Sequence, residues 1–360
     1  MHRLPALLLA LCCGGVPSPA ADAPMFVLLD GEGPEALQRG LQAAGSRGYR
    51  LIATAEGTDV SGRSRLASLL ERDPAGRSFE YAVRVGTGDL SDAAMRSAID
   101  PLFDQGFHFS PAGFVVSRRP EMWLPESAYA DQATIVLERQ TDAQSGWEYA
   151  SLVFGTEDAF HSALDTRLRE GYEVLGLWNT DRKLHVVLQR SLDGDAAPAD
   201  EAAGDHRLLL VATRKALKLR LNALARKGYR IRRAEDPPTT GPPILLLQRT
   251  AEAGTTLEYR FFSKVPGRMR KDRFADDLDR RARQGWRLTP GGLTDNVFAL
   301  ERHPRHETAP PRATYRLISP ATAAEAASSL ERALVEGYRL VTMVVEPAQT
   351  SFLVERIGAD

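Results

Sequence analysis

The chain has 360 residues, of which 43% are hydrophobic and 26% are charged, and its formal net charge is −1. This is the composition of an ordinary globular protein, so it excludes a wholly disordered or collagen-like chain. The length suggests about two domains or an array of repeats, and the near-zero net charge by itself indicates no partner.

Residues 1–20 have the pattern of a secretory signal peptide. Arg3 supplies the positive charge, and the apolar run from Leu4 to Cys13 is too short to span a bilayer. Small residues follow, with Ser18 and Ala20 at the spacing of a cleavage site. We therefore expect export from a bacterial cytoplasm and a mature chain that begins near residue 21, in the periplasm or outside the cell.

Both cysteines of the chain, Cys12 and Cys13, lie inside this segment. Cleavage would leave a mature chain without cysteine, which no disulfide can stabilise. Lipidation of one cysteine is the alternative. We disfavour it because a lipoprotein needs a small residue before that cysteine, and Leu11 precedes Cys12. No later apolar stretch approaches 18 residues, so we expect no transmembrane span in the mature chain.

Six internal repeats follow, and three sequence marks define them. The first mark is a glycine followed by an aromatic residue, and its glycines are Gly48, Gly106, Gly171, Gly228, Gly285 and Gly337. The second mark is a Leu/Val-Glu/Gln-Arg triplet, which ends in Arg72, Arg139, Arg190, Arg249, Arg302 and Arg356. The third mark is a hydrophobic-Glu-Tyr triplet, which begins at Phe79, Trp147 and Leu257 in the second, third and fifth repeats.

Each repeat is predicted to fold as strand, helix, strand and strand. In the fourth repeat, Leu217, Leu221 and Leu224 recur at the spacing of one helix face. Gly228 ends this helix, because glycine adopts the left-handed C′ position at little cost. The closing strand, Ile244 to Leu247, is apolar on both faces. One helix covers only one face of its sheet, so we expect the other face to pack on a neighbouring repeat.

The sequence thus predicts an α+β fold of six tandem βαββ repeats, with small antiparallel or mixed sheets that are each covered by one helix. The expected repeat boundaries are 24–73, 78–140, 146–192, 206–250, 256–303 and 314–360. Residues 193–205 form an acidic linker and residues 304–313 a Pro-rich one, so we expect three repeats, a flexible linker and three repeats. Short turns with Gly76, Gly146 and Gly254 at other joints are interpreted as hairpins between the last strand of one repeat and the first strand of the next.

Two stretches carry a resemblance to a known family. Trp147–Tyr149 (WEY) is followed by Gly171–Val174 (GYEV), and Leu221–Leu224 (LNAL) is followed by Gly228–Ile231 (GYRI). The chain here resembles the small bacterial modules called domain of unknown function 4177, which have a W-E-Y first strand, a helix ending L-N-x-L-x-x-x-G-W-E-L and a closing strand ending F-x-R. The resemblance covers nearly the whole mature chain as six divergent copies. It implies the repeat fold and offers no catalytic residue.

Few residues offer catalytic or metal-binding chemistry. His303 and His306 lie near Glu307 in a Pro-flanked loop. They are weak candidates for metal ligands, because a metal site usually needs three or four ligands. The chain has no nucleophile elbow, phosphate loop or dinucleotide fingerprint. We interpret the six arginines of the second mark as strand-end caps, with a row of anion-binding sites as the alternative. The aromatic residues of the first mark are expected in the core, with a ligand pocket as the alternative. We predict no catalytic residue, no cofactor and no metal.

The charge is distributed unevenly along the chain. Residues 24–192 have a net charge of −7, the linker 193–205 has −5, and residues 206–360 have +11. This asymmetry indicates an anionic partner or contact between the halves. We predict a non-enzymatic exported scaffold for an interaction or a ligand, whose partner is an unknown protein or an anionic envelope component and not nucleic acid. The alternatives are an envelope-associated binder of anionic polymer or lipid headgroups through the fourth and fifth repeats, and an enzyme of unrecognised type.

Overall fold

The structure, a computed structural model, describes residues 23–31, 33–58, 64–86, 93–117, 132–143, 145–180, 183–193, 205–211, 213–235, 243–249, 257–262, 271–293, 298–302, 312–345 and 348–358. The predicted signal peptide with both cysteines lies outside these residues, as do His303 and His306 and most of the two predicted linkers.

The first three repeats each contain a strand, a helix and two further strands, as the sequence predicts. The first repeat has β1 (Phe26–Gly31), α1 (Pro34–Gly45), β2 (Tyr49–Thr58) and β3 (Ser64–Arg72). The second has β4 (Phe79–Gly86), α2 (Ala93–Phe103), β5 (His108–Ser117) and β6 (Gln132–Gln140). The third has β7 (Trp147–Val153), α3 (Glu157–Arg169), β8 (Glu173–Thr180) and β9 (Lys183–Ser191).

The other three repeats have the same order of elements. The fourth has β10 (His206–Leu209), α5 (Arg214–Ala225), β11 (Tyr229–Glu235) and β12 (Ile244–Arg249). The fifth has β13 (Glu258–Phe262), α6 (Lys271–Ala282), β14 (Arg287–Leu293) and β15 (Phe298–Arg302). The sixth has β16 (Arg312–Ile318), α7 (Ala323–Val335), β17 (Arg339–Val345) and β18 (Thr350–Gly358).

Each repeat forms its own three-stranded antiparallel sheet, which confirms the predicted α+β repeat fold. In every sheet the last strand lies between the first and the second, as in the order β1-β3-β2. The second and last strands are neighbours in sequence and in the sheet. The first strand also pairs with the last strand, although the helix and the second strand separate the two in the sequence.

The predicted hairpins between repeats are wrong. The turn with Gly76 joins β3 to β4, and the turn with Gly146 joins β6 to β7, but each of these pairs of strands belongs to two different sheets. The physical reason is that the closing strand is central and already has a partner on both edges. At the first of these turns, Asp73 instead accepts hydrogen bonds from the N–H of Ala75 at 2.7 Å and from the guanidinium of Arg77 at 2.6 Å. Gly254 lies outside the described residues.

All six repeat glycines end their helices in the left-handed conformation, with φ between 80° and 90°. At Gly106 the backbone forms a Schellman motif: the N–H of Gly106 donates to the carbonyl of Phe103 at 2.9 Å, and the N–H of Phe107 donates to that of Leu102 at 3.0 Å. The third, fifth and sixth repeats have the same pair of bonds. The aromatic side chain that follows the glycine is buried in all six repeats.

The second strand of every repeat breaks its register with the closing strand at the same position. The break is a one-residue β-bulge in four repeats and a longer irregular stretch in the second repeat, Phe109 to Phe114, and in the fifth, Leu288 to Leu293. The register with the closing strand shifts three residues after the repeat glycine, directly after Leu51, Phe109, Val174, Ile231, Leu288 and Leu340. A bulge bends its strand and increases the local twist. Each second strand therefore changes direction at the same height.

The hydrophobic cores lie between repeats, because each helix packs both on its own sheet and on the sheet of the next repeat. Between the first and second repeats, Leu41 of α1 and Leu70 of β3 pack with Phe79 and Tyr81 of β4. Equivalent clusters join the second to the third repeat, the third to the fourth, the fourth to the fifth and the fifth to the sixth. Both faces of each sheet are thereby covered, as the apolar closing strands require.

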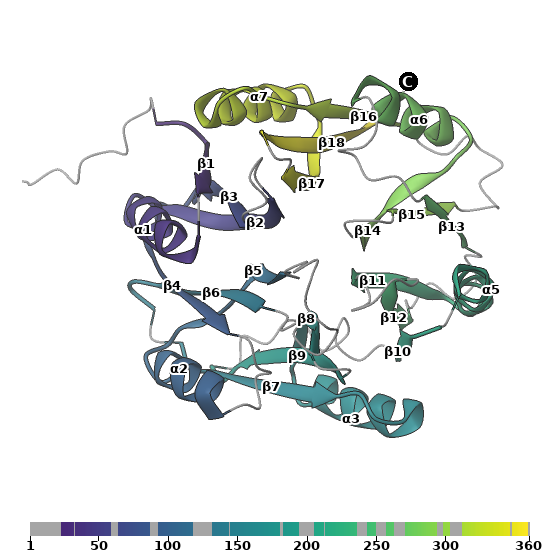
Figure 1. The fold of residues 1–360 in the computed structure, drawn as a ribbon, viewed down its shortest axis with the longest axis horizontal. Coiled ribbons are helices and arrows are strands. Elements are labelled where there is room, and N and C mark those ends of the chain that lie inside the picture. Colours follow the sequence, from purple (N-terminus) through teal and green to yellow (C-terminus); the bar gives the residue numbers. More distant parts are fainter. Residues whose placement is uncertain are drawn as a thin grey trace, which may run out of the picture.

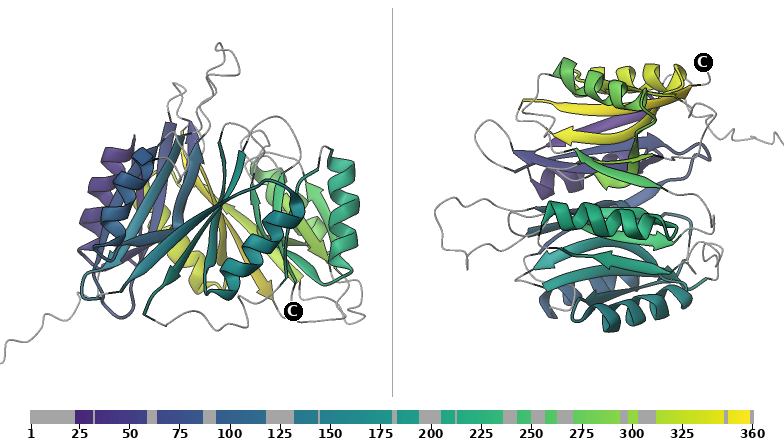
Figure 2. Two further views of the ribbon diagram at one scale, coloured as in Figure 1. Left: turned by 90° about the horizontal axis from the view of Figure 1, so that it is seen from below. Right: turned by 90° about the vertical axis from the view of Figure 1, so that its right-hand side faces the viewer.

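A sixth cluster joins the last repeat to the first and closes the ring. Leu330 of α7 and Phe352 of β18 pack with Leu28 of β1 and Leu69 of β3. Figure 1 shows the result: six units follow one another around an axis, with the helices on the outside and β2, β5, β8, β11, β14 and β17 nearest the centre. In the left view of Figure 2, α1 and α5 run roughly along this axis, whereas α3 is inclined to it. Within the described ranges, no helix is long and apolar enough to cross a membrane.

Candidate functional site

The three sequence marks meet in one side-chain cluster in the repeats that contain them all. In the second repeat, the guanidinium of Arg139 lies 4.7 Å from the ring centroid of Phe107 and 2.7 Å from the carboxylate of Glu80. The third and fifth repeats have the same cluster, formed by Arg190, Tyr172 and Glu148 and by Arg302, Trp286 and Glu258. The arginine of the second mark thus stacks on the aromatic ring of the first mark and pairs with the glutamate of the third.

These arginines also cover the C-terminal ends of the helices. Arg139 donates from Nη1 to the carbonyl of Gln105 at 2.7 Å, and Arg190 donates to the carbonyl of Glu170 at 2.9 Å. Carbonyls at a helix end lack partners within the helix, so a cation there satisfies them and interacts favourably with the helix dipole. In the other repeats, Arg356 lies 5.0 Å from the ring of Tyr338, while Arg72 and Arg249 are in register with Tyr49 and Tyr229.

A second set of polar residues forms what we call the polar belt. It consists of six cross-strand pairs, each made by the residue after the aromatic of the first mark and the middle residue of the second mark. The pairs are Arg50–Glu71, His108–Glu138, Glu173–Gln189, Arg230–Gln248, Arg287–Glu301 and Arg339–Glu355. Because every pair has the same register, the belt lies at one height around the ring.

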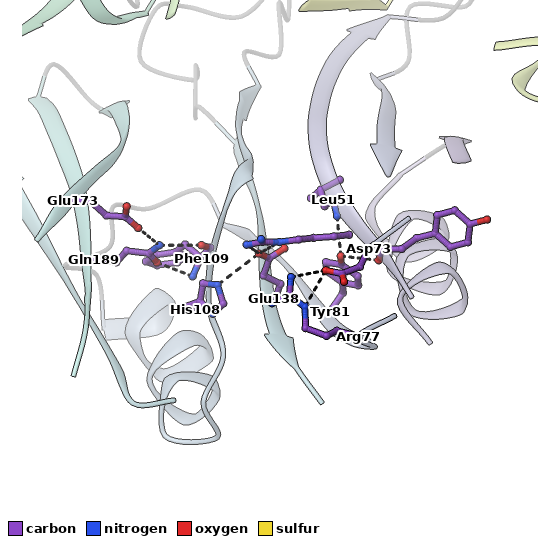
Figure 3. A network of polar contacts seen from close by, with 11 residues as sticks. Leu51, Asp73, Arg77, Tyr81, His108, Phe109, Glu138, Glu173 and Gln189 are labelled. Atoms are coloured by element: carbon purple, nitrogen blue, oxygen red, sulfur yellow. Dashed lines mark hydrogen bonds and ion pairs between the residues drawn. The ribbon is translucent and has the colours of Figure 1, made fainter. Parts of the chain in front are cut away.

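The polar belt connects neighbouring repeats. Arg50 of the first repeat donates to Glu138 of the second at 2.9 Å, and Nε2 of His108 lies 3.6 Å from the same carboxylate oxygen (Figure 3). Arg287 of the fifth repeat lies 3.3 Å from Glu355 of the sixth. Both carboxylates are at most 4% exposed. The belt therefore holds buried charges that are compensated across the interfaces.

Two belt carboxylates have opposite pKa shifts because their partners differ. Burial opposes ionisation of Glu138, but hydrogen bonds and charges from His108 and Arg50 outweigh it and lower its pKa. For Glu301 burial dominates and raises the pKa, since the charge of Arg230 and a hydrogen bond from Tyr259 compensate only in part. The same position therefore stabilises the ionised form in one repeat and disfavours it in another.

Tyrosines on the first strands bind the backbone at the register breaks of the preceding repeats. The hydroxyl of Tyr81 accepts the N–H of Leu51 at 2.9 Å and donates to the carbonyl of Tyr49 at 3.2 Å. Tyr315 likewise accepts the N–H of Leu288 at 3.0 Å. Burial raises the pKa of both hydroxyls, so they stay neutral and able to donate. At these two interfaces the register break thereby places a backbone N–H where the next repeat binds it.

The second interface uses a different side chain for this purpose. The hydroxyl of Tyr149 donates to Asp100, and Gln189 of the belt instead accepts the N–H of Phe109 at 3.0 Å and donates to its carbonyl at 3.2 Å (Figure 3). A second amide hydrogen of Gln189 reaches Glu173 at 2.8 Å. The glutamine that replaces the usual glutamate in this repeat thus has a specific partner.

Sequence reasoning missed a fourth recurring position, six residues before each repeat glycine. It is polar in all six repeats: Gln42, Asp100, Asp165, Asn222, Asp279 and Glu331. Asn222 accepts the N–H of Tyr259 at 2.7 Å and donates to its carbonyl, and Asp279 accepts the N–H of Tyr315 at 2.6 Å. Gln42, Asn222, Asp279 and Glu331 thus cover the open edge of the next repeat's first strand, whose backbone groups need partners, whereas Asp100 accepts the hydroxyl of Tyr149. The regular spacing from the glycine is the signal that could have revealed them.

The pair of the belt best suited to acid–base chemistry, His108 and Glu138, is too buried to contact a substrate. His108 and Glu138 form an acid–base pair, but Glu138 is 1% exposed and His108 stacks on Trp147 at 4.2 Å between ring centroids. Among the described residues, no group of three or more His, Cys, Asp or Glu is arranged to hold a metal ion. His303 and His306 lie outside that part of the chain.

The outer helices differ in charge. α3 has Glu157 and Asp158 in its first turn and Arg167 and Arg169 in its last, as the helix dipole favours. α5 has no acidic residue at all, with four basic residues in twelve. Among the described helices of the second half of the chain, α5 alone has a net positive charge, since α6 and α7 have at least as many acidic as basic residues. Comparison of the chain with protein-family models, curated proteins and solved structures gives no match.

Proposed function

We propose that the protein is a non-enzymatic exported scaffold, a closed ring that uses the outer faces of the described helices to contact partners. One observation carries this proposal: the recurring polar side chains bind one another between repeats, while the helices face outward and differ in charge. Glutamates of the belt that touch only protein are poor candidates for catalysis, since a catalytic group must reach the reacting atoms.

Export is part of this proposal and rests on the N-terminal pattern. Arg3, the apolar run to Cys13 and the small residues up to Ala20 are typical of a cleaved signal peptide. N-terminal sequencing of the native protein should find a first residue near position 21. An N-terminus at Met1, or an acylated cysteine, would contradict it.

Site-specific photo-crosslinking in living cells tests the contact surface. A photoreactive amino acid is placed at one exposed helix position at a time: Ser97, Ser162, Leu219 or Ser328. We expect at least one of these positions to give an adduct that mass spectrometry identifies reproducibly. The other positions should give different adducts or none. The same residue at Tyr81, which is buried between repeats, is the matched control and should give crosslinks only within the chain. The absence of adducts from all four helix positions would contradict the proposal.

A further inference from the structure

The fourth repeat has an unusually basic outer helix. No Asp or Glu occurs between Asp205 and Glu235, a stretch that contains ten Lys and Arg residues. The exposed side chains on α5 and just after it include Lys215, Lys218, Arg220, Arg226 and Lys227. None of these five forms an ion pair within the described part of the chain.

The cations of α5 surround an exposed leucine. Leu217, Leu221 and Ala225 face the core and are buried. At 100° per residue, Leu219 then lies at the centre of the outward face, where it is 63% exposed. Lys215 and Arg226 lie near it along the helix. We call this surface, formed by Leu219 and the five cations, the α5 face.

Several cations on the other outer helices pair with a nearby carboxylate. On α2, Arg96 lies 3.6 Å from Asp100, and on α3, Arg167 lies 2.8 Å from Glu170. On α6, Arg280 pairs with Asp277. The α5 face differs from them because its positive charge has no acidic neighbour on its own helix.

We propose that the α5 face docks on the surface of an anionic lipid bilayer. This inference rests on the proposed scaffold function and specifies one surface and one partner for it. A helix that has Lys and Arg around an exposed Leu suits the interface of an anionic membrane, where the cations contact headgroups and the apolar side chain enters the boundary region. The helix lies at the outer edge of the ring, where a flat surface can reach it (Figure 2). A soluble polyanion would use the same cations but would gain little from Leu219.

Vesicle binding tests this proposal with the full mature chain. The probes are vesicles of phosphatidylglycerol and phosphatidylcholine, and vesicles of phosphatidylcholine alone. We expect binding to the anionic vesicles only, weakened at 1 M salt, where the Debye length falls to about 3 Å. The variant Lys215→Gln/Lys218→Gln/Arg220→Gln should bind on the order of a hundredfold less tightly. Each cation near an anionic surface raises the binding constant about fivefold, and the variant loses three of them.

A matched control removes the same charge elsewhere. The variant Arg39→Gln/Arg169→Gln/Arg332→Gln neutralises one exposed arginine on each of α1, α3 and α7. It should bind anionic vesicles within about threefold of the wild type, since its α5 face is intact. All variants alter exposed side chains, and circular dichroism verifies that they melt like the wild type.

A third arm separates a membrane from a soluble polymer. Leu219→Ser should weaken vesicle binding by roughly fivefold, because an exposed leucine gains from partial burial, and should leave binding to dextran sulfate unchanged. The proposal would be overturned by any of three results. These are an equal loss of vesicle binding in the two triple variants, binding of the wild type to neutral vesicles, and vesicle binding that Leu219→Ser leaves unchanged. In those cases crosslinks from other helices would still support the scaffold function, so the two failures are distinguishable.

Discussion

Single residues in this ring take their role from partners in their own repeat and in the neighbouring one. Glu138 and Glu301 occupy the same position of the second mark, yet one pKa is lowered and the other is raised. The difference follows from the partners, because His108 of the same repeat and Arg50 of the preceding repeat both reach Glu138, the latter at 2.9 Å. The sequence mark alone therefore does not determine whether the carboxylate stabilises the fold.

A pair of isosteric substitutions tests this difference. Glu138→Gln should lower the free energy of unfolding by about 2 kcal/mol at pH 7, because it removes the charge that Arg50 and His108 compensate. The pKa of Glu138 is lowered in the folded state, so its stabilisation is present above its unfolded pKa of about 4.3 and is lost as the pH falls through the folded value. Urea titrations at several pH values should show the wild type and the variant converging below about pH 4.

Glu301→Gln is the matched control for that substitution. The pKa of Glu301 is raised in the folded state, so ionisation costs stability as the pH rises through the folded value. The variant should therefore be as stable as the wild type at low pH and at least as stable at pH 7. Equal destabilisation by both substitutions would show that the opposite pKa shifts are wrong.

The hydroxyl of Tyr81 is expected to stabilise the first interface. Tyr81→Phe leaves the buried N–H of Leu51 without its acceptor and should cost about 1–3 kcal/mol, measured as a change in the denaturation midpoint. Tyr149→Phe is the control, because its hydroxyl contacts Asp100, whose side chain is 45% exposed and can bind water instead. A loss for Tyr149→Phe as large as that for Tyr81→Phe would contradict the role given to the bulge.

At the scale of the elements, local and non-local features were predictable to different degrees. The order of strand, helix, strand and strand follows from hydrophobic periodicity, and the helix ends follow from the repeat glycines, since both are properties of a short stretch. Strand pairing is non-local, and for this reason the turn with Gly76 does not form the hairpin that its local sequence predicts. The contacts of Arg50 with Glu138 and of Asn222 with Tyr259 cross between repeats, so their spacing was visible in the sequence but their partners were not.

The left-handed helix ends can be tested by alanine. Gly337 has a φ of 84°, and an added Cβ would meet no atom closer than 3.7 Å, so the cost of Gly337→Ala is backbone strain alone. We expect a loss of about 1–2 kcal/mol in thermal or chemical unfolding. Gly155→Ala is the control, since an added Cβ there has open space and its φ is outside the left-handed region. That variant should be neutral or slightly more stable; equal effects would contradict the helix-end assignment.

At the scale of the whole molecule, closure replaces the terminal caps that an open array needs. A repeat whose sheet has two apolar faces leaves one face exposed at each end of an open array. Here the cluster of Leu330, Phe352, Leu28 and Leu69 covers both ends at once. Gly57 of β2 also lies so close to β17 that an added Cβ would be 2.4 Å from the carbonyl oxygen of Val345. The third and fourth repeats share a core as well, so the two halves of the chain pack together there.

Closure of the ring is tested most directly by a crosslink between the first and sixth repeats. Oγ1 of Thr350 lies 3.2 Å from the carboxylate of Asp30, although 320 positions separate them in the sequence. In a chain without Cys12 and Cys13, we replace Asp30 and Thr350 by cysteine and add a short thiol-specific crosslinker. The control pair is Asp30→Cys with Lys218→Cys. Lys218 belongs to α5, which lies across the ring from β1 (Figure 1). We predict an intramolecular crosslink in the monomer for the first pair and none for the second. No crosslink in the first pair, or crosslinks only between two chains, would contradict the closed ring.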